Sequence, residues 1–220
     1  NIVKIYGVQE SRIILVNQQP SISIENFVKP EVSTQKKIRY DLSLPKKYIF
    51  YPAMYLPHKN HKTIIDTIAL LKEKYNKLYK VVFCGNDIGY LSNLKKYANK
   101  QDLKNYISFL NYIEDDYVPY LYLDAFALVM PSLIGPTAIP PWEAFKMGVS
   151  AIFSELNGIK EVYGDAVYYI NPLEPESIAN GIKKLFEDDK LREKLILNGR
   201  KKLNEIEAKH EYKKVFKIIK

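Results

Sequence analysis

A turn rich in glycine and proline, residues 132–144, leads from an apolar segment into a predicted helix that carries one acid, Glu143. Backbone N–H groups at a helix start are unpaired and lie at the positive end of the helix dipole, so phosphate or diphosphate can dock there. We expect Glu143 in the first turn of this helix, where its carboxylate can accept hydroxyl groups of a sugar. A Pro-Pro step can also be only a stiff helix start, so the turn alone leaves both interpretations open.

Lys59 is a second candidate for binding an anion. It follows a predicted strand and a segment stiffened by prolines, and Asn60 next to it is the expected cap of a helix. A lysine beside a helix start is well placed to neutralise a diphosphate. Ligands of open α/β sheets bind beyond the carboxyl ends of the strands, where both Lys59 and the 135–143 turn are expected. Gly85 follows another strand there, although it could simply serve a tight turn.

Short apolar runs alternate with amphipathic helical patterns along the chain. The predicted strands are 48–51, 81–84, 106–110, 127–130, 149–153 and 167–170. The predicted helices are 60–74, 89–100, 118–123, one that includes 143–146, 157–163, and an all-helical stretch after residue 172 that ends in an amphipathic helix, 205–220. Strands buried on both faces and separated by helices predict an α/β fold, a Rossmann-like, doubly wound parallel sheet of about six strands with helices on both faces and a helical C-terminal tail.

Composition limits the class of protein. At 220 residues and 47% hydrophobic content, the chain is expected to form one domain, or one domain with a linker, around a large core. The single cysteine, Cys84, lies in an apolar run, which excludes a disulfide framework and favours a buried strand thiol. We find no apolar stretch near the roughly 18 residues that span a bilayer and no signal peptide, so we expect a cytoplasmic chain. Because it begins at Asn1, we expect a piece of a longer protein.

Positive charge is concentrated near the C-terminal end. Of the net charge of +8, residues 183–220 supply +6. Such a segment is usually a solvated helical face, and the alternative is peripheral contact with an anionic membrane at its inner, cytoplasmic surface. No recognisable nucleic-acid-binding motif accompanies the charge, so we expect no nucleic-acid partner.

Cofactor and metal motifs are not found in the sequence. A dinucleotide fold requires G-x-G-x-x-G after its first strand, and residues 51–60 contain no glycine; a Walker loop is also missing. The histidines, His58, His61 and His210, offer no convincing metal set, and Lys59 lies between the first two. We therefore expect neither a cofactor nor a metal.

With these residues in place, residues 48–203 resemble the C-terminal, nucleotide-sugar-binding domain of the family 4 retaining glycosyltransferases, which have the GT-B architecture. The segments that carry the resemblance, in order, are 51–61, 82–85, 129–132, 135–145, Gly148, 157–162, 165–166 and 188–192. By this resemblance, Lys59 binds the donor diphosphate and Glu143 holds the ribose hydroxyls, and both are implied to be catalytic. The backbone of residues 137–139 is implied to cradle phosphate, and residues 111–113 to border the base. The implied donor-binding residues are Gly135, Pro136, Thr137, Ala138, Ile139, Asn60, Gly85, Tyr112 and Ile113.

The same resemblance divides the chain. Residues 1–44 would be the tail of an N-terminal domain, with a last strand at residues 12–16, and a linker. Residues 45–204 would be the donor-binding domain, and residues 205–220 a helix that packs back on the missing N-terminal domain. Since the active site of this family is a cleft between domains, the isolated chain is expected to bind nucleotide and to transfer little or no sugar.

The activity implied is retaining, metal-independent transfer of a hexosyl or N-acetylhexosaminyl group. The implied donor is a UDP- or GDP-sugar, the acceptor a saccharide or a polyprenyl-diphosphate-linked molecule, and the setting bacterial O-antigen or capsule synthesis. Two positions depart from the family: Gly135 replaces an acid that touches the donor sugar, and Met54 replaces an arginine. One alternative is therefore a non-catalytic nucleotide-sugar-binding module. Another is a flavodoxin-like or epimerase-like phosphate-binding domain, in which Lys59 and Glu143 would not share a pocket.

Overall fold

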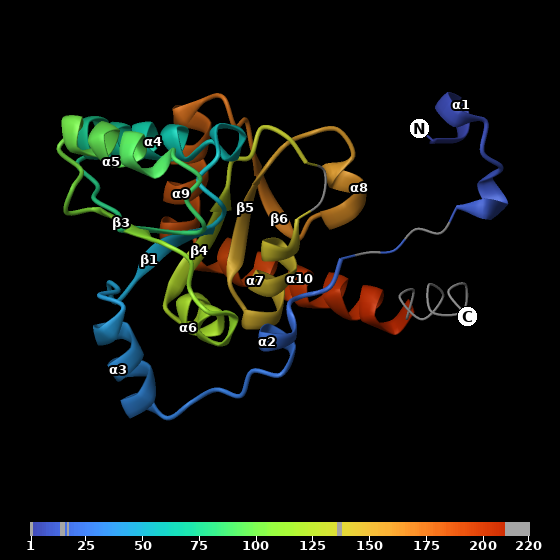
Figure 1. The fold of residues 1–220 in the computed structure, drawn as a ribbon, viewed down its shortest axis with the longest axis horizontal. Coiled ribbons are helices and arrows are strands. Elements are labelled where there is room, and N and C mark those ends of the chain that lie inside the picture. The colour runs from blue at the N-terminus through green and yellow to red at the C-terminus, as the bar shows by residue number, and fades with distance from the viewer. Residues whose placement is uncertain (1, 14–15, 17, 136–137, 210–220) are drawn as a thin grey trace.

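The computed structural model describes residues 2–13, 16, 18–135 and 138–209, and they form a six-stranded parallel sheet (Figure 1). The order of strands across the sheet is β3-β2-β1-β4-β5-β6. Their bounds are β1 Tyr48–Pro52, β2 Val81–Cys84, β3 Ile107–Leu110, β4 Ala125–Met130, β5 Ser150–Ser154 and β6 Val167–Ile170. Every neighbouring pair is parallel, which confirms the predicted Rossmann-like, doubly wound sheet.

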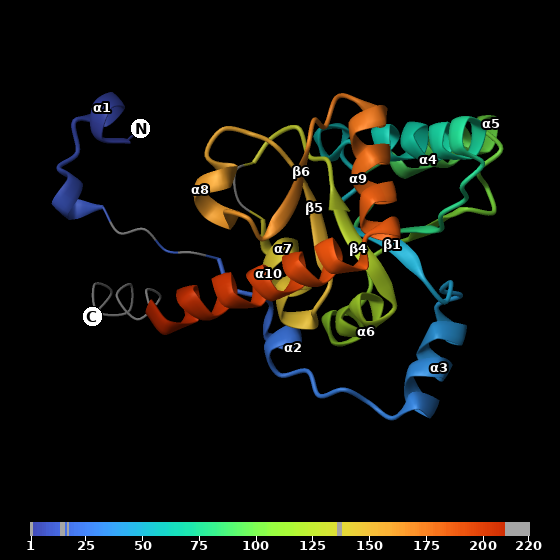
Figure 2. The same cartoon turned by 180° about the vertical axis from the view of Figure 1, so that it is seen from behind.

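Helices cover both faces of the sheet. The helices that connect or follow the strands are α4 His61–Tyr75, α5 Leu91–Lys100, α6 Val118–Leu123, α7 Ile139–Met147, α8 Ile159–Tyr163, α9 Pro175–Glu187 and α10 Asp189–Lys209. From β1 the chain winds outward to β2 and β3, and from β4 it winds the other way to β5 and β6. Since parallel crossovers are right-handed, the two windings place their helices on opposite faces. In agreement, α4 contacts α5 and α9, while α7 contacts α6 and α10 (Figures 1 and 2).

The central strands are apolar along their whole length because helices bury both of their faces. All residues of β2 and β5 are buried, as are the first four of β1. Cys84 at the end of β2 is 7% exposed, and burial raises the pKa of its thiol to about 12. The expectation of a buried strand thiol is therefore confirmed.

Several helices begin later or earlier than predicted. The helix expected from residue 89 begins at Leu91, because the Asp87 carboxylate accepts the N–H groups of Gly89, Tyr90 and Leu91 at 2.8 to 3.0 Å. These bonds, that of Leu91 first, lower the pKa of Asp87. Likewise α8 begins at Ile159 rather than 157, because Gly158 before it has a left-handed backbone.

Residues ahead of the sheet form short helices: α1 Ile2–Tyr6, the 3-10 turn η1 Glu10–Arg12, α2 Ile22–Glu25 and α3 Val32–Asp41. Arg12 lies in η1, so the strand expected at residues 12–16 does not begin there; residues 14 and 15 are outside the described residues. Helix α2 packs on α6 and α7, and its Ile24 is 1% exposed. Part of the expected N-terminal tail therefore belongs to the core of the sheet domain.

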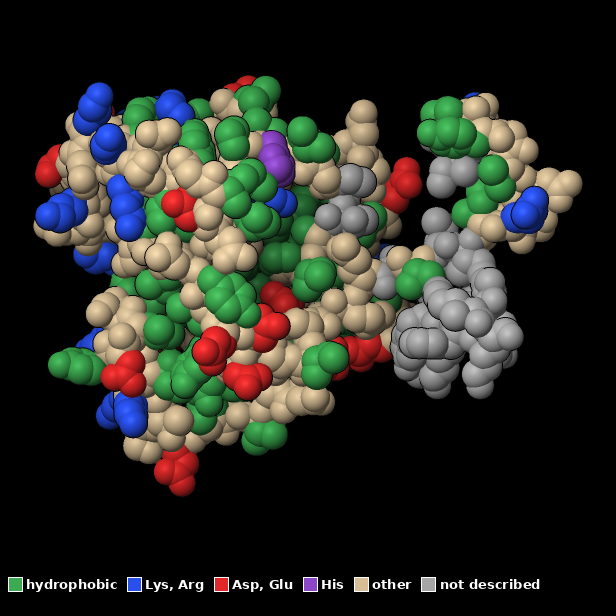
Figure 3. Space-filling model, viewed as in Figure 1, with side chains coloured by type: hydrophobic (Ala, Val, Ile, Leu, Met, Phe, Trp, Pro, Cys, Tyr) green, Lys and Arg blue, Asp and Glu red, His purple; other side chains and the backbone are tan. Residues whose placement is uncertain are grey.

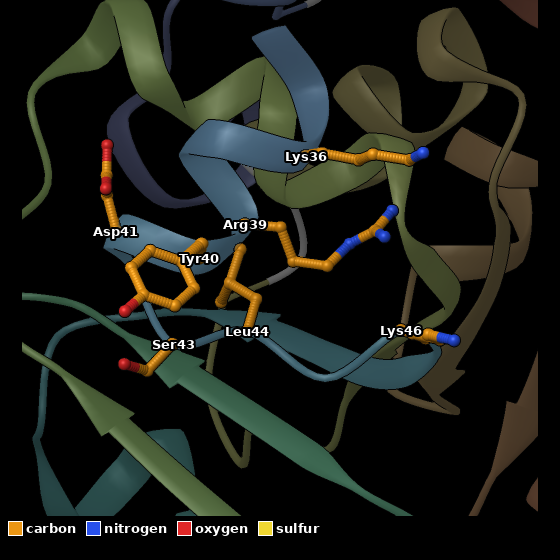
Figure 4. A pocket seen from close by; sticks show the side chains of 7 residues that line it. All are labelled: Lys36, Arg39, Tyr40, Asp41, Ser43, Leu44 and Lys46. Carbon is orange, nitrogen blue, oxygen red and sulfur yellow. The ribbon is translucent and has the colours of Figure 1, made fainter. Parts of the chain in front are cut away.

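Helix α3 is attached to the end of α6. The Arg39 guanidinium makes two bonds to the Asp124 carboxylate, at 2.8 and 2.5 Å. A pocket of about 820 Å³ lies between α3 and the segment leading into β1, and Figure 4 shows the side chains of Lys36, Arg39 and Lys46 extending to one side of it. This pocket is beside the start of β1, whereas ligands of such sheets bind beyond the strand ends. It is therefore not the candidate site.

The C-terminal helix is one element where two were expected. Helix α10 runs without a break from Asp189 to Lys209, so the expected boundary between residues 204 and 205 falls inside it. Residues 210–220 of the expected C-terminal helix lie outside the described residues. Within the described residues, no helix is both long and apolar enough to cross a membrane.

Candidate functional site

The strand order places two of the predicted segments side by side. Strands β1 and β4 are neighbours, and the chain leaves them in opposite directions, toward β2 and toward β5. In open α/β sheets the crevice at this reversal point, beyond the carboxyl ends of the strands, is where ligands bind. The 3-10 turn η2, Pro57–Lys59, follows β1, and the loop before α7 follows β4. Lys59 and the described residues after β4, 131–135, therefore flank the reversal point.

Hydrogen bonds hold the two loops together. The Leu133 N–H donates to the His58 carbonyl at 2.9 Å. The Asn60 amide donates to the carbonyls of Pro131, at 3.0 Å, and Pro172, at 2.7 Å. The loops after β1, β4 and β6 are thus joined through one side chain. Asn60 is the N-cap residue of α4, as expected, but its backbone is left-handed, φ 62°, and its side chain makes no capping bond to the helix.

Lys59 has a fixed backbone and a partly exposed side chain. The Tyr51 hydroxyl donates to the Lys59 carbonyl at 2.8 Å and lies 3.0 Å from the Ser132 hydroxyl. Among the ion pairs of the described residues, none involves the Lys59 ammonium. The Lys59 ammonium can therefore meet an anionic ligand without first leaving a carboxylate partner among the described residues.

His61, at the start of α4, is a core residue. Its ring centroid lies 4.8 Å from that of Tyr51, 5.1 Å from Tyr55 and 5.0 Å from Phe83, and it is fully buried. Burial, with a smaller effect of the Lys59 charge, lowers the pKa of His61 to about 3. The imidazole is therefore neutral at physiological pH and packs beneath the Lys59 turn.

Glu143 lies in the second turn of α7, because the helix already begins at Ile139; the expectation of a first-turn acid is wrong. The carboxylate is 6% exposed and accepts two hydrogen bonds. Ser21 Oγ donates to Oε1 at 2.7 Å and Tyr122 Oη donates to Oε2 at 2.9 Å. Burial and then the nearby carboxylate raise the pKa of the Tyr122 hydroxyl, which therefore stays a donor.

The start of α7 has fewer N–H donors than expected. Pro140 and Pro141 have no N–H group, and the Ala138 N–H donates to Tyr163 Oη at 3.2 Å. Ile139 therefore carries the remaining N–H of the first turn. The rigid prolines still preset the helical backbone and leave the helix dipole in place, so the site depends less on backbone donors and more on charge.

At two positions of the predicted site, the backbone geometry favours glycine over other residues. Gly135 has φ 105°, a backbone conformation that a residue with a side chain would adopt only with strain. At Gly85, a Cβ would lie 2.2 Å from the Ala53 carbonyl oxygen, so close packing explains this glycine. Pro136 and Thr137 lie outside the described residues.

The segment expected to border a base lies beside α3. Tyr112 is 58% exposed, and Ile113 is partly buried against the core. Both line a pocket of about 370 Å³ with Ile38 of α3 and with Leu42, which directly follows that helix. Neither Lys59 nor Glu143 lines this pocket, and its role as a base site stays a prediction. Figure 3 shows a separate hollow near the centre of this face of the molecule, with basic and acidic side chains at its rim.

Sequence reasoning did not find two residues that contact the predicted acid. Tyr122 lies on a predicted helix, where its apolar neighbours indicate a core position only. Ser21 is separated from Glu143 by 122 positions, in a polar stretch without a motif. No pattern along the chain connects either residue with Glu143.

Comparison with known proteins gives consistent matches. Residues 33–202 match the family described as Glycosyl transferases group 1. The O-antigen chain mannosyltransferase RfbU of Salmonella typhimurium is 26% identical over 185 residues, which are 84% of this chain and 47% of that protein. The chain thus spans about half the length of the curated relatives it matches.

Solved structures share the fold. A glycosyltransferase from Rickettsia africae superimposes with a TM-score of 0.80 at 18% identity, over 94% of this chain and 58% of that one. HepE of Anabaena, solved in complex with UDP, gives a TM-score of 0.76 at 17% identity, over 97% of this chain and 58% of that one.

Proposed function

The chain belongs to the group 1 glycosyl transferases, and on that premise we propose that it binds the nucleoside diphosphate part of a sugar donor between the loops after β1 and β4. The observation that carries the proposal is the position of Lys59 and of residues 131–135 on the two sides of the reversal point of the sheet. The HepE structure, which contains UDP and has the same fold, supports a nucleotide ligand.

Each residue has a proposed role. The Lys59 ammonium pairs with the diphosphate, and the positive end of α7 adds to its field. The second lone pairs of the Glu143 oxygens accept the ribose hydroxyls, since each oxygen already accepts one bond from the protein. Asn60 acts indirectly, because it holds the loops in their relative positions.

The proposed reaction is retaining sugar transfer without a metal. As the bond between the sugar and the diphosphate breaks, negative charge grows on the leaving group, and a preorganised cation and helix dipole lower the energy of that charge. Several relatives are named as O-antigen mannosyltransferases, so the sugar proposed is mannose and the setting the synthesis of a surface polysaccharide. The acceptor, a saccharide or a polyprenyl-diphosphate-linked molecule, would bind outside this chain.

A cytoplasmic position at the inner face of the membrane is part of this proposal. The basic residues after Lys183 support electrostatic contact with anionic lipids.

Calorimetric titration tests donor binding. UDP, GDP, GDP-mannose and UDP-glucose are titrated against the wild-type chain and against Lys59→Ala and Glu143→Gln, which removes charge at constant shape. Lys62→Ala is the matched control, because Lys62 is an exposed lysine on the next turn, paired with Asp66 at 3.3 Å. We expect binding of at least one nucleotide, a loss of about tenfold or more in both site variants, and no change in the control. If none of the four ligands binds, the proposal is wrong.

A non-catalytic binding module is the second candidate, supported by Gly135 and by the exposed Met54 in place of the family's acid and arginine. Both candidates predict nucleotide binding. A transfer assay separates them when it is performed on the longer protein that contains this chain. Transfer from a nucleotide-sugar excludes the module, whereas binding without transfer to any tested acceptor favours it.

A further inference from the structure

Ser21 lies ahead of the sheet domain and contacts the acid of the proposed donor site. Its Oγ donates to Glu143 Oε1 at 2.7 Å across 122 positions of sequence. We infer that Ser21 is a positioning residue for the ribose-binding carboxylate, so that the segment before α3 completes the donor site. The inference rests on the proposed function and concerns what orients Glu143 within it.

The contact belongs to a packed structure. Ser21 directly precedes α2, whose Ile24 is 1% exposed against α6 and α7. On the same side, Lys146 of α7 pairs with Glu25 of α2 at 3.0 Å and with Glu207 of α10 at 3.1 Å. A buried apolar residue and an ion pair, both within four residues after Ser21, therefore hold α2 against α6 and α7 and keep the serine beside Glu143.

Two donors determine the orientation of the Glu143 carboxylate. Tyr122 Oη, in the core, holds Oε2 at 2.9 Å, and Ser21 Oγ holds Oε1. With a single donor, the carboxylate can rotate about its last side-chain bond, which has a broad torsional preference. With two donors on different oxygens, the remaining lone pairs point in fixed directions. Two adjacent ribose hydroxyls require that arrangement from a single carboxylate.

Ser23 carries a second hydroxyl next to that of Ser21 and makes no bond to Glu143 among the described residues. Its Oγ lies 3.2 Å from that of Ser21. Since the Ser21 hydrogen is directed to Glu143, Ser21 can accept the hydrogen of Ser23. The Ser23 hydroxyl does not reach Glu143 in this arrangement, so Ser23 is a matched control on the same short helix.

The same geometry has an opposite interpretation, in which Ser21 occupies the place of a ribose hydroxyl and must leave before a nucleotide binds. The packed position of α2 favours the positioning role, because the buried Ile24 holds the Ser21 backbone beside Glu143. The two interpretations predict opposite effects of removing the hydroxyl.

The experiment compares ribose recognition in Ser21→Ala, Ser21→Thr and Ser23→Ala. UDP, GDP and their 2′-deoxy forms are titrated by calorimetry against the full 220-residue chain, with thermal unfolding of each variant as a folding check. For the wild type we expect the ribonucleotide to bind more tightly than its deoxy form. For Ser21→Ala we expect the ribonucleotide to bind about fivefold more weakly, which corresponds to the loss of one hydrogen bond. The affinity for the deoxy form should change little. Ser21→Thr, which keeps the hydroxyl, and Ser23→Ala should keep the wild-type ratio.

Three results would overturn the inference. If Ser21→Ala binds the ribonucleotide and the deoxy form equally more weakly, the serine has a structural effect only. If Ser21→Ala binds the ribonucleotide as the wild type does, the hydroxyl does not orient Glu143. If Ser21→Ala binds the ribonucleotide more tightly, Ser21 competes with the ribose. Failure of the proposed function looks different: the wild type then binds no nucleotide, or Glu143→Gln leaves binding unchanged.

Discussion

Replacing Asn60 tests how the candidate site is held together. Its amide donates to the carbonyls of Pro131 and Pro172, both buried residues, and its side-chain oxygen accepts from Thr63 Oγ1 at 2.6 Å. Its backbone has φ 62°, which asparagine tolerates and alanine does not. Two separate contributions, hydrogen bonding and backbone conformation, can therefore be measured at one position.

The expected magnitudes follow from these contacts. Asn60→Gly keeps the backbone conformation without strain and leaves two buried carbonyls without their donor. Each unpaired carbonyl costs roughly 1–3 kcal/mol, so we expect a loss of about 2–6 kcal/mol in the free energy of unfolding. Asn60→Ala adds the left-handed strain, about 1 kcal/mol. Asn60→Asp keeps the shape but directs an oxygen at two carbonyl oxygens, and we expect it to be less stable than Asn60→Gly.

Urea denaturation followed by tryptophan fluorescence measures these differences. The chain has a single tryptophan, Trp142, which is 1% exposed on α7 and therefore reports on the site as well as on the fold. The reasoning is refuted if Asn60→Gly unfolds within about 0.5 kcal/mol of the wild type, the usual range of surface substitutions. It is also refuted if Asn60→Ala is more stable than Asn60→Gly, because strain would then not contribute.

Two further predictions concern the same edge of the sheet. Gly85→Ala places a Cβ 2.2 Å from the backbone oxygen of Ala53. We therefore expect the free energy of unfolding, measured by urea denaturation, to fall by about 1–3 kcal/mol or more. A variant as stable as the wild type would contradict this close approach. Because burial lowers the pKa of His61 from 6.5 to about 3, the unfolded state binds a proton that the folded state does not. The free energy of unfolding should therefore fall by about 1.4 kcal/mol per pH unit as the pH drops from 6.5 to about 3. In His61→Asn, the contribution of His61 to this pH dependence should be missing between pH 6 and 4. An identical pH dependence in both proteins would exclude His61 as its source.

The six strands could be predicted from the sequence because parallel strands buried on both faces must be apolar throughout. All six strands predicted for the sheet are present, and their ends differ by at most two residues. Helix ends were less predictable. The start of α5 at Leu91 depends on the Asp87 side chain, and the start of α7 at Ile139 depends on two prolines that look the same inside or before a helix.

For the candidate site, residue types and local order along the sequence pointed to Lys59, Glu143 and the glycine turn, since a phosphate site needs a cation and a helix start within a short segment. The contacts that orient these residues were decided only by the tertiary structure. Asn60 joins loops after three different strands, and Ser21 reaches Glu143 across 122 positions. Such contacts depend on which strands are neighbours and on where a distant helix packs, and local periodicity carries no information about either.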